Sequence, residues 1–533
     1  MAFLAAVEVD QRQRIVTSAD KLKEMLGGSW TIEETEKLAV SVVGRHPGVD
    51  QIKIASGDVW LRSEVQADIE SCLWDFRRQI VDNLGLPCSF AIIEEEESPK
   101  AAREALMRAI RKAKDSKSGE EGHLSLPWFA PCQIQPHRYA NLWFPDRENS
   151  EQHRRRALVS QDSENRFERG YETLTHYYDG LTAVLDNHLQ IPQTMDKFAP
   201  QVGDSYLAVV RLDADNAGGF FNNLGLGPDL NYESWMPLKD CSHAFGECLR
   251  KALEQSANET IEEAIANEAL KPGSMAPISP LIAAGDDFLI VIRKDLAMPF
   301  ATRLLKKHME LAADDTVLKP HFLTADPEKK LTLSGAIVFA RSGFPFSVLS
   351  EMSVLVEKSA KKRRREQYQT KPCLDVYWLE STGREDPIQA REESLTYREE
   401  PVDGSQVYSL NTRPWTLAEA EAMQEAAKQL AKEEIPRGKW HQLLAGLKYG
   451  EPQSGFHYRR WLQHLTKNQR SCITEKVAPG LSAVRLWSSK SAPWVERFVD
   501  GTRRMVCPLL ELHQLREMSA FPKTSTDRGP EPA

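Results

Sequence analysis

Two apolar stretches, each ending in or interrupted by carboxylates, decide the fold expected for this chain: SYLAVVRLDADNAGGFF at 205–221 and LIAAGDDFLIVI at 281–292. Residues 206–212 have the composition of a buried strand. The second stretch consists of two apolar runs separated by Gly-Asp-Asp, a pattern typical of a strand–turn–strand hairpin. We expect the two stretches to lie side by side.

Four carboxylates mark the ends of these runs. Asp213 and Asp215 stand where the first strand stops, and Asp286 and Asp287 form the predicted hairpin tip. Carboxylates gathered in this way repel one another unless cations neutralise them, and hard divalent cations prefer oxygen ligands. Two metal ions so held serve nucleotidyl transfer. An Asp-Asp pair in a hairpin is also ordinary turn chemistry, so the Asp-Ala-Asp of the earlier strand is what favours a metal site.

The residues around these carboxylates are suited to a nucleotide. Asp213 and Asp286 or Asp287 are expected to hold two Mg²⁺ or Mn²⁺ ions, with the carbonyl of Ala214 as a further ligand. The Asn-Ala-Gly-Gly run after the strand lets the backbone approach phosphates at a helix N-terminus, an adjacent phenylalanine can flank a base, and a lysine near the end of a later helix can reach a triphosphate. The candidate nucleotide-binding residues are Asn216, Gly218, Gly219, Phe220 (or Phe221) and Lys361, with Lys358 and Lys362 competing for the role of the last.

The order of predicted elements around these stretches occurs twice. Residues 205–380 predict a strand, a short and a long helix, the hairpin, a helix, a strand, a helix and a last strand. Residues 3–114 predict the same core order, with Ser56-Gly57-Asp58 at the hairpin and no acidic pair. This is the split βαβ order of ferredoxin-like domains. The sequence therefore predicts an α+β fold of two ferredoxin-like βαββαβ domains, with a helical insert and a C-terminal helical domain.

Three segments carry more local expectations. The Gly27-Gly28-Ser29 triplet is expected to separate two helices of the first unit. Residues 151–188 are expected to form a charged, solvent-exposed helix. The polar residues 381–413 are expected to form a linker.

The C-terminal region combines basic and aromatic residues. Residues 436–476 contain eight Lys or Arg against two Asp or Glu. Such a mixture suits a single-stranded nucleic-acid groove or a partner subunit, and it equally suits core aromatics with solvated basic side chains. The interleaved aromatic residues are Trp440, Tyr449, Phe456, Tyr458 and Trp461.

Whole-chain properties narrow the class of protein. A chain of 533 residues with 41% hydrophobic residues forms several domains, and a net charge of −9 argues against a generally basic nucleic-acid coat. The eight cysteines form no C-x-x-C pair, which favours reduced thiols over disulfides or a zinc cluster. Neither a secretory signal nor an apolar run of about 18 residues is present, so we expect a cytoplasmic protein without a membrane span.

Several motifs, in order, resemble a known family. LDADNAGGFF, AAGDDFLIVI, LSGAIVFA and EKSAKK resemble the catalytic Palm (GGDEF-like) domain of the large subunit of type III CRISPR effector complexes. The N-terminal AAVEVDQRQRIVTSADKLKEMLGGSW resembles the start of that family's first Palm domain. The resemblance spans 1–380. It implies synthesis of cyclic oligoadenylates from ATP, with guide or target RNA and other CRISPR effector subunits as partners.

Together these patterns divide the chain. The expected domains are a non-catalytic first Palm-like domain (1–117), an irregular and helical inter-Palm region with a degenerate zinc module (118–200), a catalytic second Palm-like domain (201–380), a linker (381–413), a C-terminal helical domain (414–520) and a disordered tail (521–533).

The sequence also departs from the family pattern. The first glycine of the family's GGDD is Ala284 here, which is compatible with the hairpin if that position does not need a positive φ. Only Cys132 and His137 stand where the family's zinc module has paired cysteines, so no zinc is expected. The family's HD nuclease domain has no counterpart, so no HD-type DNase activity is expected.

Two other functions stay open. A catalytically silent, RNA-binding scaffold subunit would keep the duplicated fold without the reaction. A GGDEF-like dinucleotide cyclase would act as a homodimer and use GTP.

Overall fold

The structure is a computed structural model of the chain. It describes residues 2–10, 12–17, 22–55, 57–84, 86–96, 98–117, 142–145, 156–159, 166, 169–170, 178–199, 205–222, 224, 231–321, 331–368, 370–379, 386–399, 406–449, 453–488, 493–499 and 502–519. Among these residues, every helix is too short or too polar to cross a membrane. Cys132 and His137, on which the zinc prediction depends, lie outside the described residues.

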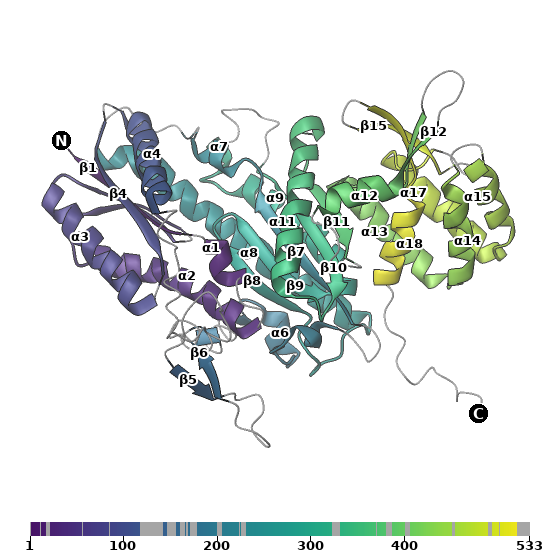
Figure 1. Ribbon diagram of the computed structural model, residues 1–533, viewed down its shortest axis with the longest axis horizontal. Coiled ribbons are helices and arrows are strands. Elements are labelled where there is room, and N and C mark those ends of the chain that lie inside the picture. Colours follow the sequence, from purple (N-terminus) through teal and green to yellow (C-terminus); the bar gives the residue numbers. More distant parts are fainter. Residues whose placement is uncertain are drawn as a thin grey trace, which may run out of the picture.

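An antiparallel sheet of order β2-β3-β1-β4 forms the first unit. Its strands are β1 (Phe3–Val9), β2 (Asp50–Ala55), β3 (Asp58–Ser63) and β4 (Cys88–Glu94). β1 lies between β3 and β4, and four consecutive residues in it are buried, which explains its continuous apolar composition. Figure 1 shows the helices of this unit around the sheet. They are α1 (Arg12–Thr17), α2 (Leu22–Val43), α3 (Gln66–Gln79), which continues into a π-helical turn (Ile80–Leu84), and α4 (Pro99–Lys117).

The glycine pair expected to break a helix instead lies inside α2. This helix runs without interruption through Gly27 and Gly28, so the predicted break is wrong. A Cβ atom on Gly27 would lie 1.9 Å from the carbonyl oxygen of Arg166, and one on Gly28 would lie 3.0 Å from that of Ile15. The glycines therefore allow two backbone segments to approach the helix. The packing gained in this way outweighs the low helix propensity of glycine.

A six-stranded sheet of order β14-β11-β10-β7-β9-β8 forms the second unit. Its strands are β7 (Tyr206–Ala214), β8 (Ile278–Ala284), β9 (Asp287–Arg293), β10 (Leu333–Arg341), β11 (Cys373–Trp378) and β14 (Trp415–Thr416). β7 occupies the middle of the sheet and pairs antiparallel with both β9 and β10. The helices of this unit are α7 (Ala217–Asn222), α8 (Met236–Ala266), α9 (Lys294–Asp314) and α11 (Phe346–Arg363), which continues into a π-helical turn (Arg364–Tyr368).

The two sheets repeat one topology. The order β2-β3-β1-β4 of the first matches the order β8-β9-β7-β10 within the second, with the second and third strands of each unit joined as a hairpin. This is the ferredoxin-like order, and it confirms the predicted α+β duplication. The consequence for the site is direct. The central strand β7 and the hairpin strand β9 are neighbours, so their carboxylates come to the same edge of one sheet.

The segment between the two units differs from the prediction in part. Residues 156–159, expected to be helical, form the strand β6 (Arg156–Val159), which pairs antiparallel with β5 (Leu142–Pro145). Ladder pairing with the apolar Leu-Trp-Phe run of β5 outweighs the local charge pattern that favoured a helix. Further on, α6 (Thr182–Asp186) and a 3₁₀ turn (Met195–Phe198) lead to the second unit.

The polar stretch 381–413, expected to be a linker, contributes ordered elements. It contains the helix α12 (Pro387–Leu395) and the strands β12 (Thr396–Glu399) and β13 (Gln406–Ser409). These strands join β15 (Val495–Val499) and β16 (Thr502–Val506) in a sheet of order β12-β13-β16-β15, with β13 and β16 parallel. The pairing partner of β13 is about one hundred residues away, so local composition did not indicate it.

The remaining C-terminal elements are helices, as expected. They are α13 (Leu417–Lys432), α14 (Arg437–Leu447), α15 (Gln453–Gln463), α16 (Lys467–Ser471), a π-helical turn (Cys472–Val477), α17 (Ala478–Ala483) and α18 (Leu509–Ser519). Of the five aromatics of this region, Trp440, Tyr458 and Trp461 are buried. Tyr449 and Phe456 are exposed. Three of the five aromatic residues are therefore core residues, whereas most of the basic residues of this segment are exposed.

Buried polar contacts join the two sheet units. The indole Nε1 of Trp235, just before α8, donates to Glu95 Oε1 at 2.9 Å, and Arg62 of β3 pairs with the same carboxylate. Arg103 of α4 is 4% exposed and donates to the carbonyl oxygens of Phe221 and Asn222 at the end of α7. The first unit therefore holds the segment that follows Asp213 and Asp215 along the chain.

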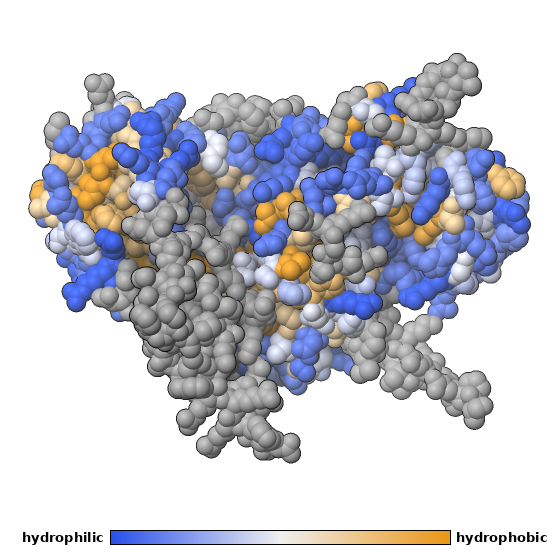
Figure 2. Space-filling model, in the orientation of Figure 1, coloured by the Kyte–Doolittle hydropathy of each residue, from blue (hydrophilic) through white to orange (hydrophobic). Residues whose placement is uncertain are grey.

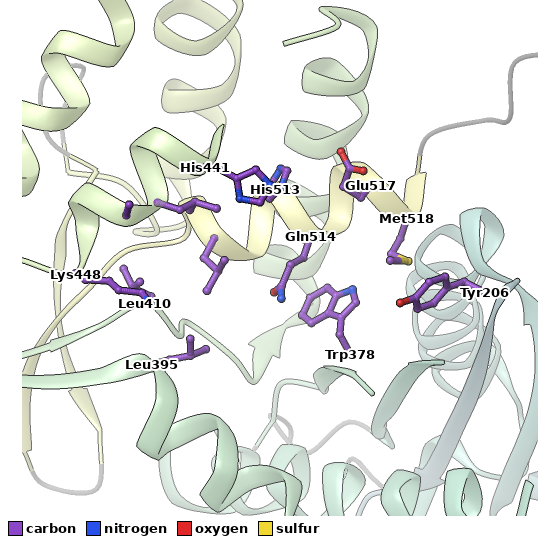
Figure 3. A pocket seen from close by; sticks show the side chains of 13 residues that line it. Tyr206, Trp378, Leu395, Leu410, His441, Lys448, His513, Gln514, Glu517 and Met518 are labelled. Carbon is purple, nitrogen blue, oxygen red and sulfur yellow. The ribbon is translucent and has the colours of Figure 1, made fainter. Parts of the chain in front are cut away.

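A cavity of about 520 Å³ lies between the second unit and the C-terminal helices. Figure 3 shows Tyr206 and Trp378 on one side and His441, His513 and Met518 on the other. Tyr206 is the first residue of β7, and Asp213 stands seven residues further along that strand, so the cavity and the carboxylates are about 20 Å apart. This cavity is not part of the carboxylate site.

Candidate metal and nucleotide site

Strand register brings the predicted carboxylates together. Asp213 of β7 is the cross-strand partner of Asp287 of β9. Beside this pair, the backbone N–H of Ala214 donates to the carbonyl oxygen of Asp286 at 3.0 Å. Like charges directly opposite each other in a sheet are destabilising, so this register is unfavourable unless something positive lies between the side chains.

The three carboxylates form one cluster. Asp213, Asp286 and Asp287 each have one carboxylate oxygen that lies within 4.8 Å of the corresponding oxygen of the other two. Asp286 is exposed, and Asp213 and Asp287 are half-buried. The cluster is therefore open to solvent on one side and backed by the sheet on the other.

Burial and mutual repulsion disfavour charge on the cluster. The pKa of Asp213 is raised to about 8, first because the carboxylate is buried, and further because Asp287 and Asp286 lie close by. Lys361 opposes this rise. Although burial lowers the pKa of Lys361, Asp213 and Glu357 together raise it, so the ammonium stays charged. Within the cluster, Lys361 therefore offsets the charge of Asp213.

Lys361 belongs to a chain of alternating charges that sequence reasoning did not identify. Its Nζ contacts Asp213 Oδ2 and lies 3.5 Å from Glu357 Oε1, one helical turn earlier on α11. Glu357 in turn accepts from Arg211 Nε of β7 at 2.7 Å, and both side chains are buried. The sequence did contain one signal for this chain of charges. Glu357 and Lys361 are four residues apart on a predicted helix, and residues with this spacing share a face. This chain fixes Lys361 against the cluster.

Asp215 does not join the cluster. Its Oδ2 accepts from Thr332 Oγ1 at 2.6 Å and Ser334 Oγ at 2.7 Å, and it lies 3.1 Å from Arg364 Nε. The side chain is 1% exposed, and burial raises its pKa even though Arg364 lowers it. Asp215 therefore ties the end of β7 to β10 and to the end of α11, a structural role.

The hairpin accommodates Ala284. Gly285 has a φ of 69°, in the left-handed region that favours glycine. Ala284 is the last residue of β8 and pairs with Asp287 in the ladder, a strand position that any L-residue adopts. The position that needs glycine is therefore the one that has it.

The loop after β7 places the predicted nucleotide-binding residues next to the cluster in sequence. Asn216 has a φ of 59° and is exposed, and Gly218 is exposed with open space around its α-carbon. A Cβ on Gly219 would lie 2.3 Å from Oδ1 of Asn216, an exposed side chain. Phe220 is half-buried and packs edge-on against Phe221, with ring centroids 5.1 Å apart.

The corresponding hairpin of the first unit is organised differently. Its Asp58 accepts from Lys53 Nζ at 2.6 Å and from Trp60 Nε1 at 2.8 Å. A single carboxylate with two local donors is satisfied within its own hairpin. The expectation that the first unit is non-catalytic stays a prediction.

The donor set of the second unit fits hard divalent cations. Carboxylate oxygens are the preferred ligands of Mg²⁺ and Mn²⁺, and the three side chains converge from one strand and one hairpin. A bound cation would oppose the rise in the pKa of Asp213 that burial and the neighbouring carboxylates cause. The residues that would hold the ions are Asp213, Asp286 and Asp287, with the carbonyl of Ala214 as a further candidate.

The raised pKa of Asp213 makes a prediction for stability. Because the folded-state pKa is about 8 and the ordinary value is 3.8, the folded protein binds more protons between these limits, and this contribution to stability is lost as pH rises towards 8. In EDTA, we expect the free energy of unfolding of wild type to fall between pH 5.5 and 8.5 by at least about 1 kcal/mol more than that of Asp213→Asn. Urea unfolding of both proteins measures this difference. Added Mn²⁺ should remove it, and identical pH profiles in EDTA would contradict the assignment.

Comparison with known proteins supports the fold of the second unit. A family model described as Cas10/Cmr2, second palm domain, matches residues 206–369. No curated protein matches the chain. The matched segment begins at β7 and ends just after α11, so it contains the whole carboxylate cluster and Lys361.

Solved structures extend the likeness over most of the chain. A Csm1–Csm4 cassette in complex with cA4 gives a TM-score of 0.51 at 14% identity, covering 97% of this chain and 70% of that chain. Csm1 from T. onnurineus gives a TM-score of 0.51 at 13% identity, covering 98% and 69%. A Csm1–Csm4 cassette in complex with cA3 gives a TM-score of 0.50 at 14% identity. The predicted resemblance to the large subunit of type III CRISPR complexes is confirmed, and the chain is Cas10-like in fold.

Proposed function

We propose that this protein is a nucleotidyltransferase that makes cyclic oligonucleotides, with oligoadenylates from ATP as the products, in CRISPR-type antiviral defence. The single observation that carries the proposal is the cross-strand juxtaposition of Asp213 and Asp287, with Asp286 beside them and one lysine against them. A site without a reaction to perform has no physical reason to gather like charges at a sheet edge.

Each residue has a distinct task in this proposal. Two Mg²⁺ or Mn²⁺ ions would lower the pKa of the attacking ribose hydroxyl and stabilise the pyrophosphate leaving group. Asp213, Asp286 and Asp287 would position these ions. Lys361 offers positive charge to the triphosphate. Asn216, Gly218 and Gly219 leave backbone accessible beside it, and Phe220 offers an aromatic face to a base.

The choice of ATP and of partners rests on the relatives. Two of the similar structures are described as complexes with cA4 and cA3, and both are Csm1–Csm4 cassettes. By analogy, we propose ATP as the substrate, cyclic oligoadenylates as the products, and other CRISPR effector subunits and guide or target RNA as partners. The division into a non-catalytic first Palm-like domain and a catalytic second one stays a prediction of the same kind.

Lys361 allows a focused test of nucleotide binding. Replacing it by Met removes the charge while keeping much of the apolar stem, so we expect kcat/KM for ATP to fall about 10- to 100-fold, mainly through KM. Steady-state kinetics of pyrophosphate release measure this effect. Lys306→Met, on the exposed face of α9, is the matched control and should leave the kinetics unchanged. Equal kinetics for wild type and Lys361→Met would remove Lys361 from the site.

The reaction itself is tested with labelled nucleotides. The protein is incubated with ATP or GTP and Mn²⁺, alone and with candidate activator RNA, and pyrophosphate and oligonucleotide products are separated. We expect oligoadenylates from ATP. Dinucleotides from GTP would favour the GGDEF-like cyclase instead. If no condition releases pyrophosphate, the proposed reaction is refuted and the catalytically silent scaffold subunit is favoured.

A further inference from the structure

A second cavity, of about 420 Å³, borders α11 on a face next to the one that carries Lys361. It lies where α11, its π-helical turn, α12 and the β15–β16 hairpin meet. Figure 2 shows hydrophilic residues over α12, and both hydrophilic and hydrophobic residues over α11. A cavity of this size is in the range of small-ligand sites. It is separate from the carboxylate cluster, since Asp213, Asp286 and Asp287 do not line it.

The lining of this cavity is strongly cationic. Seven Lys or Arg side chains border it against three Asp or Glu. The cations are Lys358, Lys362, Arg363, Arg391, Arg413, Arg497 and Arg504, and the carboxylates are Glu366, Asp386 and Glu392. A protein with net charge −9 has concentrated positive charge at one place.

The internal ion pairs leave part of this charge uncompensated. Arg391 pairs with Asp375 and Arg413 with Glu511 behind the lining, and Arg504 pairs with Glu392 within it, one carboxylate for each guanidinium. A further pair of arginines shares a single carboxylate.

That shared carboxylate is Glu419. Arg363 NH2 lies 3.4 Å from Glu419 Oε2, and Arg497 NH2 contacts Glu419 Oε1. The arginine side chains are 9% and 13% exposed. Burial, with Arg363 adding to it, lowers the pKa of Arg497 despite Glu419. Two nearly buried guanidinium groups on one carboxylate create a local demand for an anion.

Unsatisfied donors point the same way. Among the described residues, the Nε atoms of Arg391 and Arg504 are buried and make no hydrogen bond. Arg391 as a whole is 5% exposed. Each guanidinium is paired through its other nitrogens, Arg391 with Asp375 and Arg504 with Glu392, so the cost of burying these cations is only partly offset within the protein.

Aromatic faces border the cations. Phe498 is 67% exposed at the rim, which is unusual for a large apolar side chain. The Arg363 guanidinium lies 5.1 Å from the centroid of the Tyr368 ring. Exposed aromatic rings beside cations are the combination that binds the base and the phosphates of a nucleotide.

We propose that this cavity binds the phosphate groups of a nucleotide, carried either by a free nucleotide or by a single-stranded nucleic acid. The shared arginines at its base and the exposed Lys358 and Lys362 at its rim contact the phosphates. Phe498 stacks on the base. This site is independent of the proposed reaction, because none of these residues belongs to the carboxylate cluster.

ATP binding in EDTA tests the proposal, because without divalent ions the carboxylate cluster repels a triphosphate. Calorimetry compares wild type with Lys358→Ala/Lys362→Ala. We expect binding to weaken at least about tenfold and to depend less on salt. The control is Arg108→Ala/Lys112→Ala, an exposed basic pair with the same spacing on α4, which should bind as wild type does.

Further probes identify the ligand chemistry. Phe498→Ala should weaken ATP binding but not binding of inorganic tripolyphosphate, because only ATP has a base to stack. The second probe is a labelled ten-nucleotide single-stranded RNA. If the double lysine variant loses affinity for this RNA but not for ATP, the site exists and its ligand is a single-stranded nucleic acid. Unchanged affinity of the double lysine variant for both ATP and RNA would overturn the proposal. Asp286→Asn/Asp287→Asn should retain this binding even if no reaction exists.

Discussion

The double variant Asp286→Asn/Asp287→Asn is expected to lose nucleotidyl transfer by at least about 10³-fold while folding as well as wild type or better. The loss follows because neutral amides are poor ligands for Mg²⁺, and metal ions contribute several kcal/mol of charge stabilisation to such reactions. The gain in folding follows because Asp287 lies directly opposite Asp213. Removing that repulsion in EDTA is worth up to about 1 kcal/mol.

Two measurements on the same protein separate this account from a merely structural role. Pyrophosphate release reports the reaction, and urea unfolding in EDTA reports stability. Asp58→Asn, at the corresponding hairpin of the first unit, serves as the control and should leave the rate unchanged, since Asp58 is already paired with Lys53 and Trp60. If the double variant is less stable than wild type in EDTA, the cluster is not held under electrostatic strain.

Asp215→Ala is expected to cost about 3 to 5 kcal/mol of unfolding free energy. The substitution leaves the guanidinium of Arg364, whose side chain is 10% exposed, without its carboxylate, and it removes the acceptor of Thr332 and Ser334. Breaking a buried ion pair from one side is costly because the other charge stays buried. Urea unfolding at pH 7 measures this loss.

A graded series strengthens the test of Asp215. Asp215→Asn keeps the shape and can still accept from the hydroxyl groups, so it should lose less than Asp215→Ala. Asp196→Ala is the control, because the side chain of Asp196 is 66% exposed and 4.0 Å from its nearest cation. An unfolding free energy for Asp215→Ala within about 1 kcal/mol of wild type would refute the structural role.

Much of the central architecture followed from local patterns. The apolar run of β7 and the two runs of the β8–β9 hairpin have clear composition and turn chemistry, and their order in the chain predicted the ferredoxin-like topology. Once β7 and β9 are neighbours, strand register alone places Asp213 opposite Asp287. The position of Asp213 opposite Asp287 could therefore be predicted from short stretches of sequence.

Other features depend on contacts that local patterns do not encode. Gly27 and Gly28 allow Arg166 and Ile15 to approach α2, but the sequence presents them only as helix breakers. The parallel pairing of β13 with β16 joins segments far apart in the chain, which made a polar stretch look like a linker.

Side-chain direction was the other limit. Lys358, Lys361 and Lys362 are equivalent in composition, and only the docking of α11 on the sheet shows that Lys361 contacts Asp213. Asp213 and Asp215 could not be distinguished from sequence either. Residues two apart on a strand point to the same side, but this alternation no longer holds where the strand ends. The hydroxyl groups of Thr332 and Ser334, which bind Asp215, lie over one hundred residues further on.

The most direct test of the central claim is the stoichiometry of Mn²⁺ binding, measured by electron paramagnetic resonance in the presence of a non-hydrolysable ATP analogue. The account predicts two Mn²⁺ ions per wild-type chain, close enough for their spins to couple, and loss of the coupled signal in Asp286→Ala/Asp287→Ala. Equal Mn²⁺ binding by wild type and this variant would contradict the assignment of the carboxylate cluster as a metal site, and with it the proposed reaction.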